Sequence, residues 1–283
     1  MSQPDETTPL ALAAHAFEVA QIICGLWLLW RLVLSPGARA RREVRLAEWR
    51  LPPIDFACFV GFGIVGAIAV SGVGALAVRH SRMGPAAATI IGSALADGGF
   101  LLGIAGFHFT FGARVPGPGG PGTFGAALKS GLVTFLISMP IVVAVGNGWD
   151  FALRSLSLPD EKQELVNLFE NTHSAVLRWV FLAVAVLIAP AAEEFLFRGG
   201  LFRYFRTRMP RWVAIILTSA LFGAPHVSWA DHMAGLPSFL PLIALAAVFC
   251  LAYERTGMIG TVIVAHALFN LNSMLQFVTG IGS

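Results

Sequence analysis

Long apolar runs separated by short polar segments make up most of this chain. A helix needs about 20 mostly apolar residues to cross the hydrocarbon core of a bilayer. We expect eight membrane-spanning helices, at residues 10–31, 55–78, 85–109, 124–147, 174–202, 211–229, 236–254 and 257–280. The pattern therefore predicts an all-α fold, a polytopic transmembrane helix bundle.

Composition supports this fold and narrows the range of partners. Hydrophobic residues make up 56% of the chain and charged residues 12%, whereas soluble domains carry about 25% charged residues. The net charge of +3 is small, so we expect the lipid bilayer as a partner and no nucleic acid. The three cysteines, Cys24, Cys58 and Cys250, are scattered through apolar stretches and lack the spacing of a metal site.

Basic residues gather in alternate connections between the predicted spans. The connections at 36–50, 110–123, 203–211 and 255–256 hold most of the arginines. Because cytoplasmic loops carry an excess of Lys and Arg, we place these connections in the cytoplasm and both termini outside. We expect a multi-pass integral protein of the plasma or inner membrane in a bacterium, or of an ER-type membrane in a eukaryote.

A segment rich in proline and glycine, at 116–122, divides the chain. Such a composition favours turns and flexible connections over helix. We expect two domains. Residues 1–123 would form an N-terminal transmembrane region of three spans that includes a basic cytoplasmic loop and this linker, and residues 124–283 would form the second domain.

Glu193 and Glu194 stand side by side inside an apolar run. A charged side chain at the centre of a bilayer costs about 2.5–3.5 kcal/mol on insertion scales, so the two carboxylates need either partners or a function. Arg198 lies four residues after Glu194, which allows an ion pair on one helix face. Glu193 points about 100° away around the helix, so that pair need not engage it.

Polar residues of two later spans fall at the same depth as these carboxylates. Glu193 lies 16 residues before the turn at Met209–Pro210 and His226 lies 16 residues after it, about 24 Å along each straight helix. His266, with Asn270 one turn further on, lies ten residues beyond the next turn, about 15 Å deep. We expect these four side chains to converge on one site in the membrane.

Three motifs in this order resemble those of the CPBP family of intramembrane proteases, which includes CAAX prenyl endopeptidases and the ABI-type bacteriocin-immunity proteins. The motifs are Glu193-Glu194-x-x-x-Arg198, Phe222-x-x-x-His226 and His266-x-x-x-Asn270. The resemblance covers about residues 125–280, so that 124–283 would be a CPBP-like protease domain. It implies packed transmembrane helices around a membrane-embedded catalytic cavity that is accessible from the cytoplasm.

The resemblance also implies roles for these residues. Glu193 and His226 would bind and deprotonate the water that attacks a peptide carbonyl, while Glu194 and Arg198 would hold Glu193 in place. His266 and Asn270 would stabilise the oxyanion. The substrate would be a membrane-associated peptide or protein, with CAAX-type processing of a prenylated C-terminus as one form.

The sequence leaves the use of a metal open. Glu193, His226 and His266 are acceptable zinc ligands, which makes zinc the one candidate cofactor. The chain contains no HExxH motif, which is the usual mark of a zinc protease helix. Because a Glu/His pair can activate water without a metal, we favour metal-independent catalysis.

Two other functions remain as alternatives to a protease. A non-catalytic scaffold or immunity protein would use the same cavity for binding, and a small transporter would use Glu193 and His226 as a proton relay. Two further polar residues in predicted spans, Asp97 and Lys129, are candidates for an ion pair or for the lining of a path.

Overall fold

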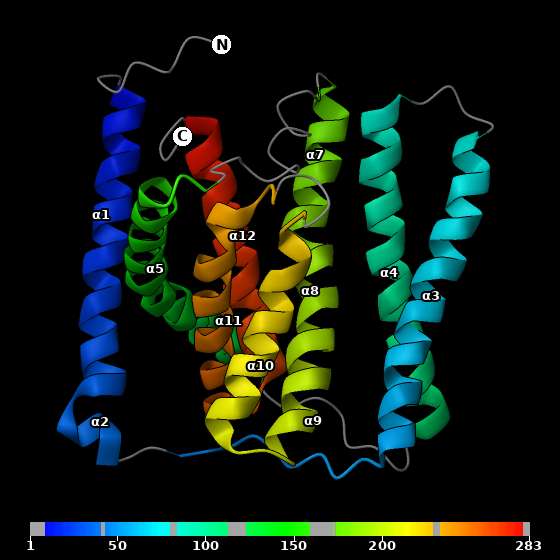
Figure 1. Cartoon of the computed structure of the whole chain (residues 1–283), viewed down its shortest axis with the longest axis horizontal. Coiled ribbons are helices and arrows are strands. Elements are labelled where there is room, and N and C mark those ends of the chain that lie inside the picture. Colours follow the sequence, from blue (N-terminus) through cyan, green and yellow to red (C-terminus); the bar gives the residue numbers. More distant parts are fainter. Residues whose placement is uncertain are drawn as a thin grey trace.

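The computed structural model describes residues 9–40, 43–79, 84–112, 123–158, 172, 174–228 and 233–279. In these ranges every regular element is a helix, and the long helices run side by side (Figure 1). Helix α1 stands at one edge of the bundle and the pair α3 and α4 at the other, with α5 and α7 to α12 between them. The predicted all-α fold is confirmed.

The N-terminal elements are α1 (Pro9–Leu29), the π-helical segment η1 (Trp30–Leu34), α2 (Pro36–Ala40), α3 (Pro53–Arg79) and α4 (Pro85–Phe111). Helices α3 and α4 pack closely because glycines face each other. A Cβ atom at Gly66 would lie 2.2 Å from the carbonyl oxygen of Gly99. Small residues of this kind let membrane helices approach each other closely.

The remaining elements follow α5 (Phe124–Ser155). They are α7 (Ala175–Ala183), η2 (Val184–Ile188), α8 (Ala189–Glu194), η3 (Phe195–Phe202), α9 (Arg203–Arg206), α10 (Arg211–Gly223), η4 (Ala224–His226), α11 (Leu236–Thr256) and α12 (Ile259–Thr279). Here η2 and η3 are π-helical and η4 is a short 3₁₀ turn. The run from Ala175 to Arg206 is long and apolar enough to be one span.

Six helices of the described residues are long and apolar enough to cross a membrane, namely Leu12–Leu34, Pro53–Leu76, Pro85–Phe111, Phe124–Ser155, Ala175–Arg206 and Leu236–Thr256. The multi-pass membrane architecture is therefore confirmed, but the predicted count of eight is not. Helix α10 has 13 residues and ends at Gly223, two residues before Pro225. Helix α12 has 21 residues, but His266, Asn270 and other polar side chains interrupt its apolar run.

The helices before α5 do not form one layer. Helix α1 packs against α5 and α12, whereas α4 packs against α7, η2 and α8. The contact of α1 with α12 includes a buried hydrogen bond from Gln21 Nε2 to Asn272 Oδ1 at 3.0 Å. The predicted boundary at 123/124 remains a prediction, and the Pro/Gly-rich linker at 116–122 lies outside the described residues.

An extended segment, residues 43–52, connects α2 to α3 along one end of the bundle (Figure 1). We call it the strap. Its backbone is held by the ends of other helices: the amides of Arg45 and Leu46 donate to the Glu254 carbonyl at 3.0 and 3.1 Å. At the same end the buried Glu254 carboxylate accepts from Arg206 and Arg211. These contacts tie the strap to the helices that carry the candidate site.

Candidate active site

The two adjacent glutamates occupy the last turn of α8, between two π-helical segments. Pro190 stands in the first turn of α8 and has no N–H to donate to the preceding turn. π-Helical turns inside longer helices occur frequently at functional sites. Local backbone irregularity therefore brackets Glu193 and Glu194 on both sides.

Glu194 is fully buried and has two cationic or polar partners. Arg198 Nη1 donates to Glu194 Oε1 at 2.8 Å, and His266 Nδ1 lies 2.8 Å from the same oxygen. Arg198 Nη2 also donates to the Ala246 carbonyl at 3.2 Å. The predicted ion pair between Glu194 and Arg198 is thus confirmed, and it holds the His266 ring as well.

The Arg198 guanidinium is also enclosed by aromatic rings. Its Cζ atom lies 4.6 Å from the centroid of the Phe222 ring and 5.3 Å from that of Phe249. A cation over a ring face in a desolvated setting contributes about 2 kcal/mol. These rings fix the guanidinium, and through it Glu194, at one place in the bundle.

Glu193 has a different environment from its neighbour. Its side chain is 31% exposed, and its Oε2 atom lies 3.8 Å from His266 Nε2. That oxygen is buried and has no hydrogen-bond partner among the described residues. Because 3.8 Å exceeds a direct hydrogen bond, Glu193 Oε2 and His266 Nε2 are close neighbours that do not bond directly.

His226 lies in the 3₁₀ turn η4, directly after α10. Its Nδ1 is 2.9 Å from the Phe222 carbonyl oxygen, and the described residues show no hydrogen bond between His226 and Glu193. The Phe222 ring lies 5.3 Å from the His226 ring and 5.8 Å from the His266 ring, centroid to centroid. Phe222 therefore joins the two histidines into one cluster.

Asn270 extends from α12 to the neighbouring segment η2. Its Nδ2 donates to the Ala185 carbonyl at 2.7 Å. Ala185 lies five residues before Pro190, the position whose missing N–H would close a π-helical turn. Asn270 thus satisfies a carbonyl that Pro190 leaves free, a structural role that sequence analysis did not anticipate.

Asp97 of α4 is a further carboxylate in this region. It is half-buried and interacts electrostatically with Glu193, and α4 packs against α8. Lys129 is exposed near the start of α5, and the described residues show no ion pair between Lys129 and Asp97. A polar residue in an apolar run was the only sequence signal for Asp97.

The candidate zinc ligands do not fit a metal. Within the described ranges, no group of three or more His, Cys, Asp or Glu side chains is arranged to hold a metal ion. Glu193, His226 and His266, the candidate zinc ligands, are therefore not brought together as a metal-binding group. The structure gives no support to a metalloprotease.

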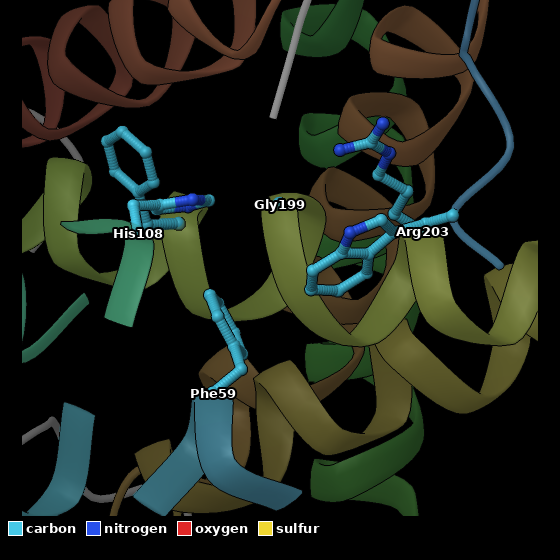
Figure 2. Close-up of a pocket in the computed structure, with 6 residues that line it drawn as sticks. Phe59, His108, Gly199 and Arg203 are labelled. Atoms are coloured by element: carbon cyan, nitrogen blue, oxygen red, sulfur yellow. The ribbon is translucent and has the colours of Figure 1, made fainter. Parts of the chain in front are cut away.

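A pocket lies beside this cluster, further along η3 (Figure 2). Its six lining residues are Trp49, Phe59, His108, Phe195, Gly199 and Arg203. Glu193 is not among them, so the predicted catalytic cavity around Glu193 is not confirmed. The N-terminal helices and the strap supply three of the six lining residues, which sequence analysis did not anticipate.

Comparison with known proteins places this cluster in a family. Residues 175–272 match the family model described as type II CAAX prenyl endopeptidase Rce1-like. No curated protein and no solved structure matches the chain. All six candidate site residues, from Glu193 to Asn270, lie within the matched segment. The match at residues 175–272 thus supports a CPBP/CAAX protease family for this part of a multi-pass membrane protein.

Proposed function

We propose that the protein is an intramembrane endopeptidase in which Glu193 is the general base. The observation that carries this proposal is the contrast between the adjacent carboxylates. Glu194 is fully buried and its Oε1 binds Arg198 and His266, whereas Glu193 is 31% exposed and makes no ion pair with an arginine among the described residues. A base must keep an oxygen free to take a proton and must be reached by water. The Oε2 atom of each glutamate lacks a partner, but only Glu193 is partly exposed.

The attacking water would lie beside Glu193 Oε2 and His266 Nε2, which are 3.8 Å apart, and contact both. Glu193 takes one proton from the water as the water oxygen bonds to the scissile carbonyl carbon. The C–N bond then breaks, and the proton passes to the leaving amine. His226, whose ring contacts Phe222 next to His266, would assist this transfer, since general acid–base catalysis contributes about 10²–10⁴-fold.

The oxyanion would be stabilised by His266 and Asn270. Because a carboxylate accepts hydrogen bonds, Nδ1 of His266 carries the proton in its contact with Glu194. A second proton on Nε2 would then make the ring a donor, with its charge offset by Glu194. Asn270 has two amide hydrogens, and its hydrogen bond to Ala185 uses one of them.

The substrate would be a membrane-associated peptide. The matching family model is described as a CAAX prenyl endopeptidase, which makes a prenylated protein C-terminus the first class to test. Access would be from the cytoplasm. The strap lies at the same end of the bundle as the turn between α9 and α10, which follows Arg203 and Arg206 and contains Arg208. Arginines favour the cytoplasmic side.

The test compares new peptide termini in membranes that contain wild type or Glu193→Ala at equal levels. Termini found only with the wild type would support the proposal and define the cleavage motif. Identical termini, with both proteins folded and inserted, would contradict it and favour a binding or immunity role for the same cluster. The comparison covers every membrane peptide at once, so it does not depend on the choice of a substrate.

A further inference from the structure

A hollow larger than the pocket of Figure 2 lies between the strap and the turn that connects α9 to α10. Its volume is about 440 Å³, which falls within the range of small-molecule sites, about 300–1,000 Å³. We call it the strap hollow, and its lining residues are Glu48, Arg50, Leu51, Pro52, Thr207 and Arg208. The strap residues among them lie outside the family match at 175–272, so the family motifs do not specify this site.

The walls of the strap hollow are fixed by hydrogen bonds between the strap and the turn. The Trp49 amide donates to Thr207 Oγ1 at 3.0 Å. Arg208 Nη1 donates to the Trp49 carbonyl at 3.3 Å, and Arg208 Nη2 donates to that of Leu51. The Arg208 guanidinium also lies over the Tyr204 ring, with Cζ 3.7 Å from the centroid. The hollow is therefore preformed, so a ligand does not bear the cost of ordering the strap.

The lining of the strap hollow carries one positive charge that no carboxylate balances. Arg50 Nε donates to Glu48 Oε2 at 2.7 Å, so the charges of this exposed pair cancel. The hydrogen bonds of Arg208 go to neutral carbonyl oxygens, and it makes no ion pair within the described ranges. The two Nη atoms of Arg50 have no hydrogen-bond partner among the described residues. A ligand with a single negative charge would balance Arg208 and accept hydrogen bonds from Arg50.

Tryptophan side chains mark the level of the membrane surface at this end of the bundle. Trp212 is exposed at the start of α10, and Arg211 Cζ lies 5.0 Å from its ring centroid. Trp27 is exposed near the end of α1, and Arg31 Cζ lies 5.0 Å from its ring centroid. Exposed tryptophans and arginines anchor membrane proteins at the membrane–water interface. Because Arg208 lies only four residues before Trp212, the strap hollow lies at the level of lipid headgroups.

An apolar surface adjoins the strap hollow on the membrane side. Pro52 of the lining is followed by Pro53 and Ile54 in the first turn of α3, and Ile54 is 69% exposed. The run from Pro53 to Leu76 is apolar enough to cross a membrane, so its exposed side chains face lipid tails. A lipid with its headgroup in the strap hollow would place its acyl chains along α3. A soluble anion would make no contact with this surface.

We propose that the strap hollow binds the phosphodiester of an anionic phospholipid in the leaflet at this end of the bundle. A phosphodiester carries one negative charge, which matches the unbalanced charge of Arg208. Hydrogen bonds from arginine to phosphate are charge-assisted and often bidentate, and basic pockets of membrane proteins bind anionic headgroups. A zwitterionic headgroup would bring a cation beside Arg50 and Arg208 and leave the positive charge unbalanced. This site is separate from Glu193 and does not depend on the proposed protease function.

The test measures lipid binding to the full-length protein in a non-ionic detergent, without turnover. The probes are short-chain phosphatidylglycerol and short-chain phosphatidylcholine with the same acyl chains, each titrated calorimetrically. We expect phosphatidylglycerol to bind at least about fivefold more tightly, because only its headgroup has a net charge to balance Arg208. Equal affinities for the two lipids would overturn the proposal.

Arg50→Gln locates the lipid, because Arg50 is exposed and its loss should leave the fold intact. We expect phosphatidylglycerol to bind about threefold more weakly or worse, since a charge-assisted hydrogen bond is lost. The matched control is Arg39→Gln, at an exposed position of α2 at the same end of the bundle (Figure 1). It removes the same charge outside the hollow and should weaken binding by less than about 1.5-fold, because salt screens distant charges. Equal weakening in the two variants would indicate general attraction to a basic surface and overturn the site.

Arg208→Gln removes the unbalanced charge itself. We expect this variant to bind phosphatidylglycerol and phosphatidylcholine with affinities within about twofold of each other, since the charge that distinguishes the two headgroups is lost. Thermal unfolding checks that the variant is folded, because Arg208 also holds the strap. A full preference for phosphatidylglycerol in folded Arg208→Gln would overturn the assignment, and Arg50→Gln decides the proposal if Arg208→Gln does not fold.

Inorganic phosphate has the same acceptor chemistry as a lipid phosphodiester, so it serves as the competitor that separates a lipid from a soluble anion. At constant ionic strength, we expect an excess of about 100-fold over the lipid to reduce phosphatidylglycerol binding by less than about twofold, because phosphate buries no apolar surface against α3. Displacement of the lipid by phosphate at comparable concentrations would assign the strap hollow to a soluble phosphate and overturn the lipid proposal.

Discussion

Two buried glutamates of this protein, Glu194 and Glu254, look alike in isolation. Each lies almost fully inside the bundle, and each has two nitrogen partners. Glu254 at the strap end binds Arg206 and Arg211, and its backbone carbonyl also holds the strap. Its cluster contains no second carboxylate with an unpartnered oxygen among the described residues.

The cluster around Glu194 differs in the group beside it. Glu193 has an oxygen without a partner, and it shares His266 with Glu194 across 3.8 Å. A saturated ion cluster stabilises or positions helices, whereas a cluster with an unsatisfied carboxylate beside a polarised imidazole can transfer a proton. The difference supports a structural role for Glu254 and the proposed catalytic role for Glu193.

Glu194→Ala should have the largest effect on stability and turnover, because Glu194 neutralises the buried Arg198 and positions His266. The substitution leaves the buried Arg198 charge without its carboxylate, a change that destabilises proteins by about 3–5 kcal/mol. It also frees His266, so turnover should be lost together with stability. Thermal unfolding in detergent and peptide turnover measure the two effects. An unchanged melting temperature would show that Arg198 does not depend on Glu194.

His226→Phe should affect the chemistry alone. The phenylalanine ring keeps the packing against Phe222 and removes the group that assists proton transfer. We expect turnover to fall by about 10²–10⁴-fold with an unchanged melting temperature. Normal turnover in this variant would remove His226 from the proposed mechanism.

Glu254→Gln should affect stability alone. The glutamine keeps one acceptor oxygen but loses the charge that pairs with Arg206 and Arg211, so we expect a loss of about 1–3 kcal/mol. Turnover per folded molecule should stay within about twofold, the scale of substitutions that leave the transition-state contacts intact. The control is Glu43→Gln, in the exposed pair with Arg45, where no measurable loss is expected. A large turnover defect in folded Glu254→Gln would contradict the division between the clusters.

Chelation should have the smallest effect. Neither glutamate cluster holds a metal-binding group among the described residues, and the Glu193 mechanism needs only water. We expect full turnover after exhaustive dialysis against a chelator, measured together with the zinc content. Loss of turnover that is restored by added zinc would contradict this mechanism.

Sequence was sufficient for the helical membrane class and for the pairing of Glu194 with Arg198, because apolar run length and i,i+4 spacing are local properties. Depth arithmetic also predicted that Glu193 and His266 share a layer, and their side chains lie 3.8 Å apart. Both results depend on helix geometry that the chain imposes over one or a few turns.

Other features depend on interactions that residue spacing does not encode. The arithmetic assumed straight α-helices, whereas π turns flank α8 and a 3₁₀ turn carries His226. The partner of Asn270 is a backbone carbonyl left free by Pro190. The strap is likewise held through its backbone by distant arginines, so nothing in residues 43–52 indicated that Trp49 lines the pocket of Figure 2.

The central claim is that Glu193 is the base and that its buried neighbours are not. The most direct measurement is turnover per folded molecule for Glu193→Gln and Glu254→Gln, side by side in the same reconstituted membranes. The account predicts a loss of about 10³-fold or more for Glu193→Gln with its melting temperature retained, and near-normal turnover for Glu254→Gln. Substantial turnover by folded Glu193→Gln would contradict the account.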